Sequence, residues 1–410
     1  MSDDINLSLS SNGKELSMNK QQLEQILDPI LNSTVQGGCP IAGVVAGVTD
    51  RDETLYLNHA GERDISTHIP MTDDSVFAIF STTKAITTTI ALQQYEKGML
   101  DLDAPAKEYV PEIGELKLLK GFDTSGNPIL CEPKIDVTTR MLLLHTAGMG
   151  YDFFNPDYQK LTSEHGYPSV ITASKASLKT PLLFEPSTQW EYGANIDWAG
   201  LVTEAVGGQR LGHLMQEQIF NPLGMQDSAF TLTPSMLQRR VAMHHRQVDG
   251  SLIADPDFIL PQDPEVHMGG HGLYSTVDDY LKFIRLWLNR GAVNGQQLLQ
   301  ESTIDLALNN GLADIAMKNL PGAIPALSND VNIYPEATKG WTLGFMVNEE
   351  ETESGRPAGT IGWCGLANLY YWIDLKHNIG AYWATQTLPF MDPTAYNGFL
   401  AFENAINSMK

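Results

Sequence analysis

The chain has 410 residues, of which 42% are apolar, and it carries a formal net charge of -23. This length allows two or three domains, or one α/β domain with a large insertion, and the apolar content is enough for a sizeable core. The negative charge argues against nucleic acid and anionic membrane surfaces as partners, because both would repel the protein.

The N-terminal segment, residues 1–18, is polar and lacks the basic and apolar regions of a secretory signal peptide. No stretch of the chain approaches the ~18 apolar residues of a membrane span. The cysteines Cys39, Cys131 and Cys364 are too few and too scattered for a disulfide framework or a structural zinc site. These features predict a cytoplasmic protein with free thiols. They leave the oligomeric state open, and a homo-oligomer is compatible with them.

The first predicted elements are a helix over residues 19–32 and an antiparallel hairpin. The strands of the hairpin cover residues 41–49 and 54–61, and a polar turn joins them. A second helix follows over residues 82–97, with Gly98 in the C-cap position. Its many threonines are poor helix formers, so burial must hold this helix.

From about residue 100 to 270 the sequence predicts helical segments broken by Pro and Gly, with no convincing alternating strands. A helix over residues 280–288 comes next, with Ser275 or Thr276 as its cap. Four strands and a final helix are predicted over residues 341–347, 359–365, 368–374, 379–385 and 393–409.

The order of these elements predicts an α/β fold in which both ends of the chain complete one antiparallel sheet, flanked by helices. Residues 19–98 and 270–410 would then form the α/β domain. Residues 99–269 would form an inserted, mainly helical region.

A serine and a lysine lie one helical turn apart at the start of the second predicted helix. Ser81 and Lys84 share one helix face, so a desolvated Lys84 that has lost its proton can activate the Ser81 hydroxyl as a nucleophile. The flanking residues are apolar, which predicts burial for both. Two further Ser-x-x-Lys matches, at Ser11 and Ser17, lie in polar sequence and carry no such signal. The alternative for Ser81 is an N-cap serine followed by an ordinary lysine.

Tyr192 lies in a polar turn that runs into a helix, where simple packing would also explain a tyrosine. A phenol has a pKa of about 10 when free, and it can act as a general base only if a nearby cation lowers that pKa. Lys84 is the cation that we expect there.

Five motifs occur in order along the chain: Ser81-Thr-Thr-Lys84, Leu144-His-Thr-Ala-Gly148, Tyr192-Gly-Ala-Asn-Ile-Asp197, Gly269-Gly-His-Gly-Leu-Tyr-Ser-Thr276 and Gly362-Trp-Cys-Gly365. With them the chain resembles the serine β-lactamase and penicillin-binding-protein superfamily, and most closely its family VIII carboxylesterases. The resemblance covers nearly the whole length, and it implies a β-lactamase-like fold.

The resemblance also implies how the site would work. An acyl-enzyme would form on Ser81, and Lys84 and Tyr192 would relay protons; which of the two is the resting base stays open. The oxyanion hole would consist of the backbone N–H groups of Ser81 and Leu366, and such donors typically contribute ~3 kcal/mol each to the transition state. No metal and no cofactor is expected, since the chain has no His-Glu-x-x-His, Walker A or dinucleotide motif.

The chain departs from the β-lactamases at two places. The asparagine that they carry two residues after the tyrosine is replaced by Ala194, and Asn195 comes one position later. Their Lys-Thr-Gly triplet is replaced by Trp363, Cys364 and Gly365, much as Trp-Gly-Gly stands there in the esterases. We expect this triplet to contact the substrate, without a charge to bind a drug carboxylate.

Tyr151 and Phe153 follow the His-Thr-Ala-Gly turn and are expected to line the acyl pocket, with plain core packing as the alternative. His145, inside that turn, is expected to be a structural hydrogen-bonding residue rather than a catalytic base.

Together these features predict a carboxylesterase, a serine hydrolase that cleaves small, short-chain carboxylic esters. The rival functions are an acyltransferase or an amide or β-lactam hydrolase of the same fold, and a non-catalytic scaffold. The intact residues Ser81, Lys84 and Tyr192 argue against the scaffold.

Overall fold

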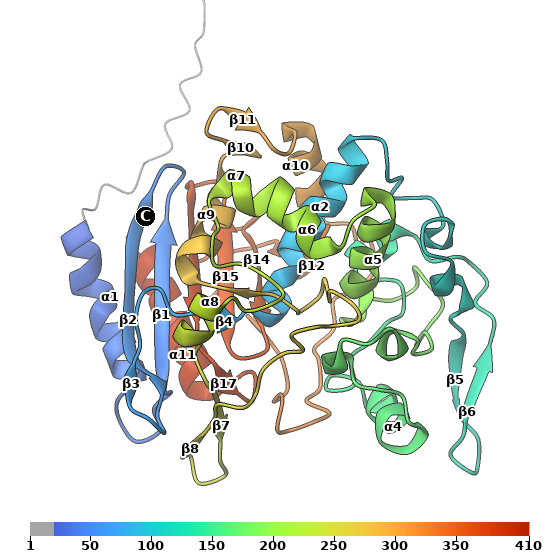
Figure 1. The fold of residues 1–410 in the computed structure, drawn as a ribbon, viewed down its shortest axis with the longest axis horizontal. Helices are drawn as coiled ribbons and strands as arrows, with labels where there is room; N and C mark the ends of the chain where they lie inside the picture. The colour runs from blue at the N-terminus through green and yellow to red at the C-terminus, as the bar shows by residue number, and fades with distance from the viewer. Residues whose placement is uncertain (1–19, 410) are drawn as a thin grey trace, which may run out of the picture.

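The computed structural model describes residues 20–409, so the predicted N-terminal segment over residues 1–18 lies outside the described residues. At its centre is an eight-stranded sheet with the order β12-β13-β14-β15-β16-β1-β2-β3 (Figure 1). The strands are β1 (Gly43–Thr49), β2 (Thr54–Asp64), β3 (Ile69–Pro70), β12 (Lys339–Trp341), β13 (Met346–Asn348), β14 (Ile361–Gly365), β15 (Leu369–Asp374) and β16 (Ile379–Ala384). N-terminal β1 pairs with C-terminal β16, and all pairings in this sheet are antiparallel. The expected sheet, completed by both ends of the chain, is confirmed.

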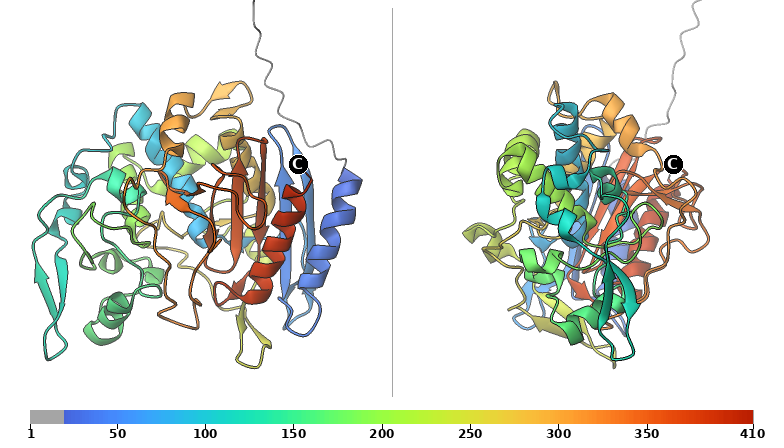
Figure 2. Two further views of the ribbon diagram at one scale, coloured as in Figure 1. Left: turned by 180° about the vertical axis from the view of Figure 1, so that it is seen from behind. Right: turned by 90° about the vertical axis from the view of Figure 1, so that its right-hand side faces the viewer.

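Helices cover both faces of the sheet. Successive side chains of a strand point to opposite faces, and in the central strands the side chains on both faces are mostly apolar, so both faces need to be covered. Tyr370 of β15 stacks on Phe399 of α11 (Pro393–Asn407), with ring centroids 4.4 Å apart. The next residue, Tyr371, faces Tyr280 of α9 (Val277–Leu288) on the other side. Seen from behind, α1 (Lys20–Thr34) lies beside α11 on the outer face (Figure 2).

Helix α2 (Thr83–Glu96) runs between the sheet and the helical part of the molecule (Figure 1). A single 3-10 turn, Phe80–Thr82, leads into it, and α2 packs on α5 (Asn195–Gly207). All but the last two residues of α2 are buried, in line with the prediction that burial holds this threonine-rich helix.

The insert between the two parts of the sheet is mostly helical, but it also contains two hairpins. Its other helices are α3 (Thr139–Leu143), α4 (Pro156–His165), α6 (Leu211–Met215), α7 (Asn221–Leu223) and α8 (Pro234–Arg239). The hairpins are β5 (Leu118–Phe122) with β6 (Pro128–Cys131), and β7 (Met243–Arg246) with β8 (Leu252–Asp255). The expectation of no strands there is therefore wrong. The reason is that strands of four or five residues, most of them only partly buried, show too little alternation to be recognised.

None of the helices within residues 20–409 has the length and apolar character needed to cross a bilayer. Several smaller elements complete the fold. These elements are β4 (Phe77–Ala78), β9 (Tyr274–Ser275), β10 (Ala292–Val293), β11 (Gln296–Gln297), β17 (Thr387–Leu388) and α10 (Glu301–Leu308). Thr276, one of the two expected caps, accepts a hydrogen bond from the backbone of Asp279 at the start of α9.

The strand expected over residues 341–347 is in fact the hairpin of β12 and β13. Gly344 has a φ of +88°, which L side chains rarely adopt, and a Cβ atom on it would lie 2.2 Å from Thr88 Oγ1 of α2. The backbone of Thr342 bonds that of Phe345 across the turn. The glycine therefore bends the chain where the apolar pattern alone predicts a continuous strand. The division into two domains stays a prediction.

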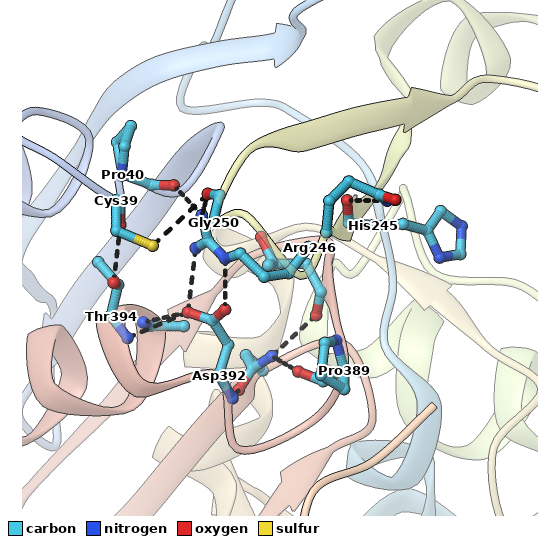
Figure 3. Close-up of polar contacts among 12 residues, drawn as sticks. Cys39, Pro40, His245, Arg246, Gly250, Pro389, Asp392 and Thr394 are labelled. Carbon is cyan, nitrogen blue, oxygen red and sulfur yellow. Dashed lines mark hydrogen bonds and ion pairs between the residues drawn. The ribbon is translucent and has the colours of Figure 1, made fainter. Parts of the chain in front are cut away.

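A largely buried ion pair ties the β7–β8 hairpin to the start of α11 (Figure 3). Arg246 Nε lies 2.8 Å from Asp392 Oδ2, and the two side chains are 10% and 1% exposed. Asp392 also caps α11, since its Oδ1 accepts the backbone N–H groups of Thr394 and Ala395. Arg246 further donates to the carbonyl of Pro40, just before β1. One guanidinium thus joins three segments that are far apart in the sequence.

Candidate active site

Ser81 lies in the 3-10 turn before α2, where it is partly exposed. Phe80 precedes it with a φ of +43°, an unusual conformation for a residue with a side chain. The N-cap of α2 is Thr82, and no side chain caps the helix there. The alternative that Ser81 is an ordinary N-cap serine is therefore not what the structure shows.

Lys84 is only 1% exposed, and its ammonium group lies among oxygen atoms. Lys84 Nζ is 3.1 Å from Ser81 Oγ, 3.1 Å from Tyr151 Oη and 2.7 Å from the carbonyl oxygen of Gly270. Burial lowers the pKa of Lys84 to about 7, and the charge of Asp197 offsets part of this effect. A large fraction of Lys84 is therefore neutral near neutral pH.

Tyr192 lies directly before α5 and is 2% exposed. Trp363 Nε1 of β14 donates a hydrogen bond of 2.7 Å to Tyr192 Oη, and the Ser81 hydroxyl also bonds this phenol. Lys84 Nζ lies over the face of the Tyr192 ring, 4.6 Å from its centroid. Burial raises the pKa of Tyr192 well above its ordinary value. The expectation that Lys84 lowers this pKa is wrong, because the ammonium group faces the ring and not the hydroxyl.

Asp197 is a completely buried carboxylate on the first turn of α5. It accepts the Tyr151 hydroxyl at 2.8 Å and the backbone N–H of Gly270 at 2.7 Å. His271 Nδ1 lies 3.3 Å from it. A Cβ atom on Gly270 would lie 2.4 Å from the carboxylate, so this close approach requires a glycine. We did not predict a role for Asp197; its only signal was its place in the Tyr192 motif.

Tyr151 has polar contacts that the sequence did not predict, and its part in an acyl pocket, like that of Phe153, stays a prediction. The Tyr151 hydroxyl contacts Lys84 and Asp197, so Tyr151 belongs to the polar network around the lysine. Phe153 stacks on its ring with centroids 5.0 Å apart.

The triplet on β14 divides between the two faces of the sheet. Trp363 faces the site, whereas Cys364 pairs with Tyr370 and lies near Arg356 on the α11 side. The Cys364 side chain is thus not brought to Ser81, and burial raises the pKa of its thiol. Gly365 meets the turn of Ser81, since a Cβ atom there would lie 2.7 Å from the Ile79 carbonyl oxygen. Leu366 follows, and its part in an oxyanion hole stays a prediction.

His145 has the structural surroundings that we expected. It is completely buried, and its Nδ1 lies 2.9 Å from Asn195 Nδ2. The Asn195 NH2 group also lies within hydrogen-bond distance of the carbonyl oxygens of Met149 and Glu191, so its N–H groups are directed at these partners and not at Ser81. Burial lowers the pKa of His145 far below its ordinary value.

The described residues contain no group of three or more His, Cys, Asp or Glu side chains that could hold a metal ion.

Comparison with known proteins places this fold and site in a family. Residues 31–405 match the Beta-lactamase family, and the chain belongs to that family, as its motifs led us to expect. It is an enzyme of the β-lactamase fold.

Several relatives are similar over most of the chain. Monacolin J acid methylbutanoyltransferase of Aspergillus terreus is 32% identical over 346 residues, which cover 82% of this chain and 83% of that protein. The lovastatin esterase of Penicillium rubens is 30% identical over 377 residues, covering 88% and 92%. Among solved structures, simvastatin synthase from Aspergillus terreus matches with a TM-score of 0.79 at 27% identity, covering 94% of this chain and 98% of that chain.

Proposed function

We propose that this protein is an acyltransferase that forms an acyl-enzyme on Ser81 and passes the acyl group to a hydroxyl group of a small molecule. Hydrolysis of the same acyl-enzyme, the esterase activity that the sequence predicts, is the second candidate function. The observation that carries the proposal is the distance of 3.1 Å between Ser81 Oγ and the buried Lys84 Nζ. Since burial lowers the pKa of Lys84 to about 7, its amine can take the serine proton.

In the first half of the reaction, Lys84 accepts the Ser81 proton while Oγ attacks the carbonyl carbon of the acyl donor. Tyr192 gives its proton to the leaving group. This role suits a phenol whose pKa is raised by burial, because such a phenol keeps its proton until the leaving group needs it. Trp363 donates to the tyrosine oxygen and stabilises the phenolate that remains.

In the second half, the Tyr192 phenolate takes the proton of the acceptor hydroxyl, whose oxygen attacks the acyl carbon. The bond between Ser81 and the acyl carbon then breaks, and Ser81 recovers its proton from Lys84. Ser81 thus recovers its own proton, and Tyr192 takes from the acceptor a proton that replaces the one that left with the leaving group. The lysine and the tyrosine need not exchange protons directly, in agreement with the position of the ammonium group over the tyrosine ring.

Transfer is favoured over hydrolysis by the relatives. Several of them are acyltransferases, among them the monacolin J acid enzyme and a methylbutanoyltransferase named for ML-236A carboxylate, and one is an esterase. The names of the relatives refer to small molecules, so we expect a small hydroxylated acceptor and a short acyl group.

The proposal is tested by measuring how the acyl-enzyme divides between transfer, which gives an ester, and hydrolysis, which gives the free acid. The enzyme is given p-nitrophenyl 2-methylbutanoate with and without monacolin J acid, and the acid and ester products are measured by chromatography and mass spectrometry. We expect ester to exceed free acid at millimolar acceptor. Free acid alone at every acceptor concentration would identify an esterase. Ser81→Ala is the control and should form neither product above background.

A further inference from the structure

The hydrogen bonds around Lys84 have directions that can be assigned from the chemistry of their partners. An ionised carboxylate can only accept hydrogen bonds, so the Tyr151 hydroxyl donates its one proton to Asp197. The Tyr151 oxygen, 3.1 Å from Lys84 Nζ, must then accept an N–H from the lysine. The carbonyl oxygen of Gly270 can only accept as well, and it lies 2.7 Å from the same nitrogen.

These two acceptors determine where the lone pair of a neutral Lys84 points. A neutral amine has two N–H groups and one lone pair. With its N–H groups directed at Tyr151 and Gly270, the remaining direction is toward Ser81 Oγ, at 3.1 Å. This is the arrangement in which the lysine can take the serine proton.

Both acceptors are held by the same carboxylate. Asp197 accepts the hydroxyl of Tyr151 through Oδ2 and the N–H of Gly270 through Oδ1. We propose that Asp197 is a positioning residue: it fixes the proton of Tyr151 and the peptide of Gly270, and thereby aims the Lys84 lone pair at Ser81. This inference rests on the proposed function, because it explains how the base of that function is oriented.

Loss of the Asp197 carboxylate should change the hydrogen bonds of Lys84. If Tyr151 no longer donates to Asp197, its hydroxyl is free to donate to the neutral amine of Lys84 and so occupy the lone pair. An asparagine at position 197 has one oxygen where the aspartate has two. It cannot replace both Oδ2, which accepts the Tyr151 hydroxyl, and Oδ1, which accepts the Gly270 N–H, so its NH2 group would face one of these donors.

Asp197 also acts on Lys84 through its charge. The ionisable groups that face the ammonium group or lie next to it are Asp197 of α5, His271 beside it, and three buried side chains. These three are Tyr151, Tyr192 and His145. Asp197 is the carboxylate among them, and its charge raises the pKa of Lys84 against the effect of burial. Removing the charge should lower this pKa further.

The first experiment is the pH profile of kcat/KM for a p-nitrophenyl ester with wild type and Asp197→Asn. We expect kcat/KM at the optimum to fall about 10- to 100-fold, as for a misplaced catalytic group. We also expect the acidic limb to move down by about one pH unit or more, since a nearby opposite charge typically contributes that much. A variant within threefold of wild type whose limb does not move would overturn the proposal.

Asp279→Asn is a matched control. Asp279 is also a buried aspartate in the first turn of a helix, and it accepts the backbone N–H of Asp227 and the Ser228 hydroxyl. This variant should lose stability without any shift of the acidic limb. A shift of the same size in both variants would assign the effect to general loosening of the fold and would contradict the inference.

Tyr151→Phe keeps the inference testable if Asp197→Asn fails to fold. It removes the acceptor but leaves the Asp197 charge, so we expect a fall of about 10- to 100-fold with an unmoved acidic limb. If the double variant Asp197→Asn/Tyr151→Phe folds, its kcat/KM at the optimum should be little lower than that of Asp197→Asn alone. The reason is that both substitutions affect the direction of the same Lys84 lone pair. A Tyr151→Phe enzyme with wild-type activity would contradict the orientation argument.

Labelling with a fluorophosphonate tests the proposed function separately from the role of Asp197. Mass spectrometry of the labelled wild-type enzyme should place the adduct on Ser81. An adduct elsewhere would overturn the proposed function itself. An adduct on Ser81 with an unchanged pH profile in Asp197→Asn would overturn only the role of Asp197.

Discussion

Trp363 Nε1 lies 2.7 Å from Tyr192 Oη, and because an indole N–H can only donate, the tyrosine oxygen is the acceptor of this bond. The position held by lysine in the penicillin-directed relatives thus supplies a neutral donor to the phenol. It can stabilise a phenolate without adding a charge that would attract a carboxylate.

Trp363→Phe should therefore slow acylation while keeping an aromatic ring in place. Hydrogen bonds to charged groups contribute ~1.5–3 kcal/mol, so we expect kcat to fall about 10- to 100-fold. In a Tyr192→Phe background the same substitution should have little further effect. Trp341→Phe is the control: its indole donates to the Leu143 carbonyl and should affect stability more than kcat. Equal losses of kcat in both tryptophan variants would contradict the specific role of Trp363.

The acidic limb of kcat/KM should report the titration of Lys84. The lysine acts as a base only when neutral, so activity should fall as the pH drops through its pKa, which burial lowers to about 7. Stopped assays with a p-nitrophenyl ester between pH 5 and 9 would measure this limb. A limb below pH 5, in the range of a carboxylate, would point to a different base.

The same lysine should make stability depend on pH. Its ordinary pKa of 10.5 applies to the unfolded chain, and the value in the folded protein is about 7. Between these values the unfolded chain binds a proton that the folded protein does not, so the free energy of unfolding should rise with pH across this window. Urea unfolding of wild type and Lys84→Met at pH 7 and 9 would show it. The difference between the two proteins should shift in favour of wild type at the higher pH.

Small esters should be far better substrates than β-lactams. Trp363 replaces a lysine, Ala194 replaces an asparagine, and the neighbouring Asn195 amide is engaged with His145 and two backbone carbonyls. Loss of a charged contact and a hydrogen bond is worth roughly 2 to 5 kcal/mol, or about 30-fold to several thousand-fold in efficiency. We would compare kcat/KM for a p-nitrophenyl ester and nitrocefin on one preparation. A nitrocefin value equal to or above the ester value would refute this expectation.

The ion pair between Arg246 and Asp392 should matter for stability and not for catalysis. Arg246→Met leaves a carboxylate that is 1% exposed without its cation, which typically costs ~3–5 kcal/mol. Arg140→Met breaks the exposed pair with Asp103 and should cost no more than ~1 kcal/mol. Urea unfolding would measure both, with esterase activity at 20 °C as the control. Similar losses of stability in the two variants would show that the buried pair has no special weight.

The parts of the site that the sequence predicted are those encoded by local spacing. Ser81 and Lys84 lie one turn apart in an apolar segment, and the structure keeps them 3.1 Å apart. The motif around Tyr192 has a similar local character, so its position before a helix could also be predicted. The central strands β1, β14, β15 and β16 were predictable because they carry nearly continuous apolar runs and are buried throughout.

The parts that were missed depend on contacts between distant segments. Asp197 meets Tyr151 and Gly270, which are 46 and 73 residues away in the chain, and no spacing rule connects them. A carboxylate in the first turn of a helix is also common for purely local reasons. Cys364 was grouped with Trp363 because the triplet was treated as one unit, although neighbouring residues of a strand point to opposite faces.

The pairing of β1 with β16 places Val45 opposite Ala384. On the ribosome, the hairpin of β1 and β2 is therefore made long before β16. The edge of β1 that pairs with β16 lacks this partner strand until almost the whole polypeptide has emerged. Such long-range pairing slows folding. An unpaired, apolar strand edge also promotes aggregation with other nascent chains. The turn that carries Ser81 is also synthesised early, whereas β14, which packs against it, follows far later in the chain. Premature termination upstream of β16 should yield insoluble, inactive protein, even when every residue of the polar network has been translated.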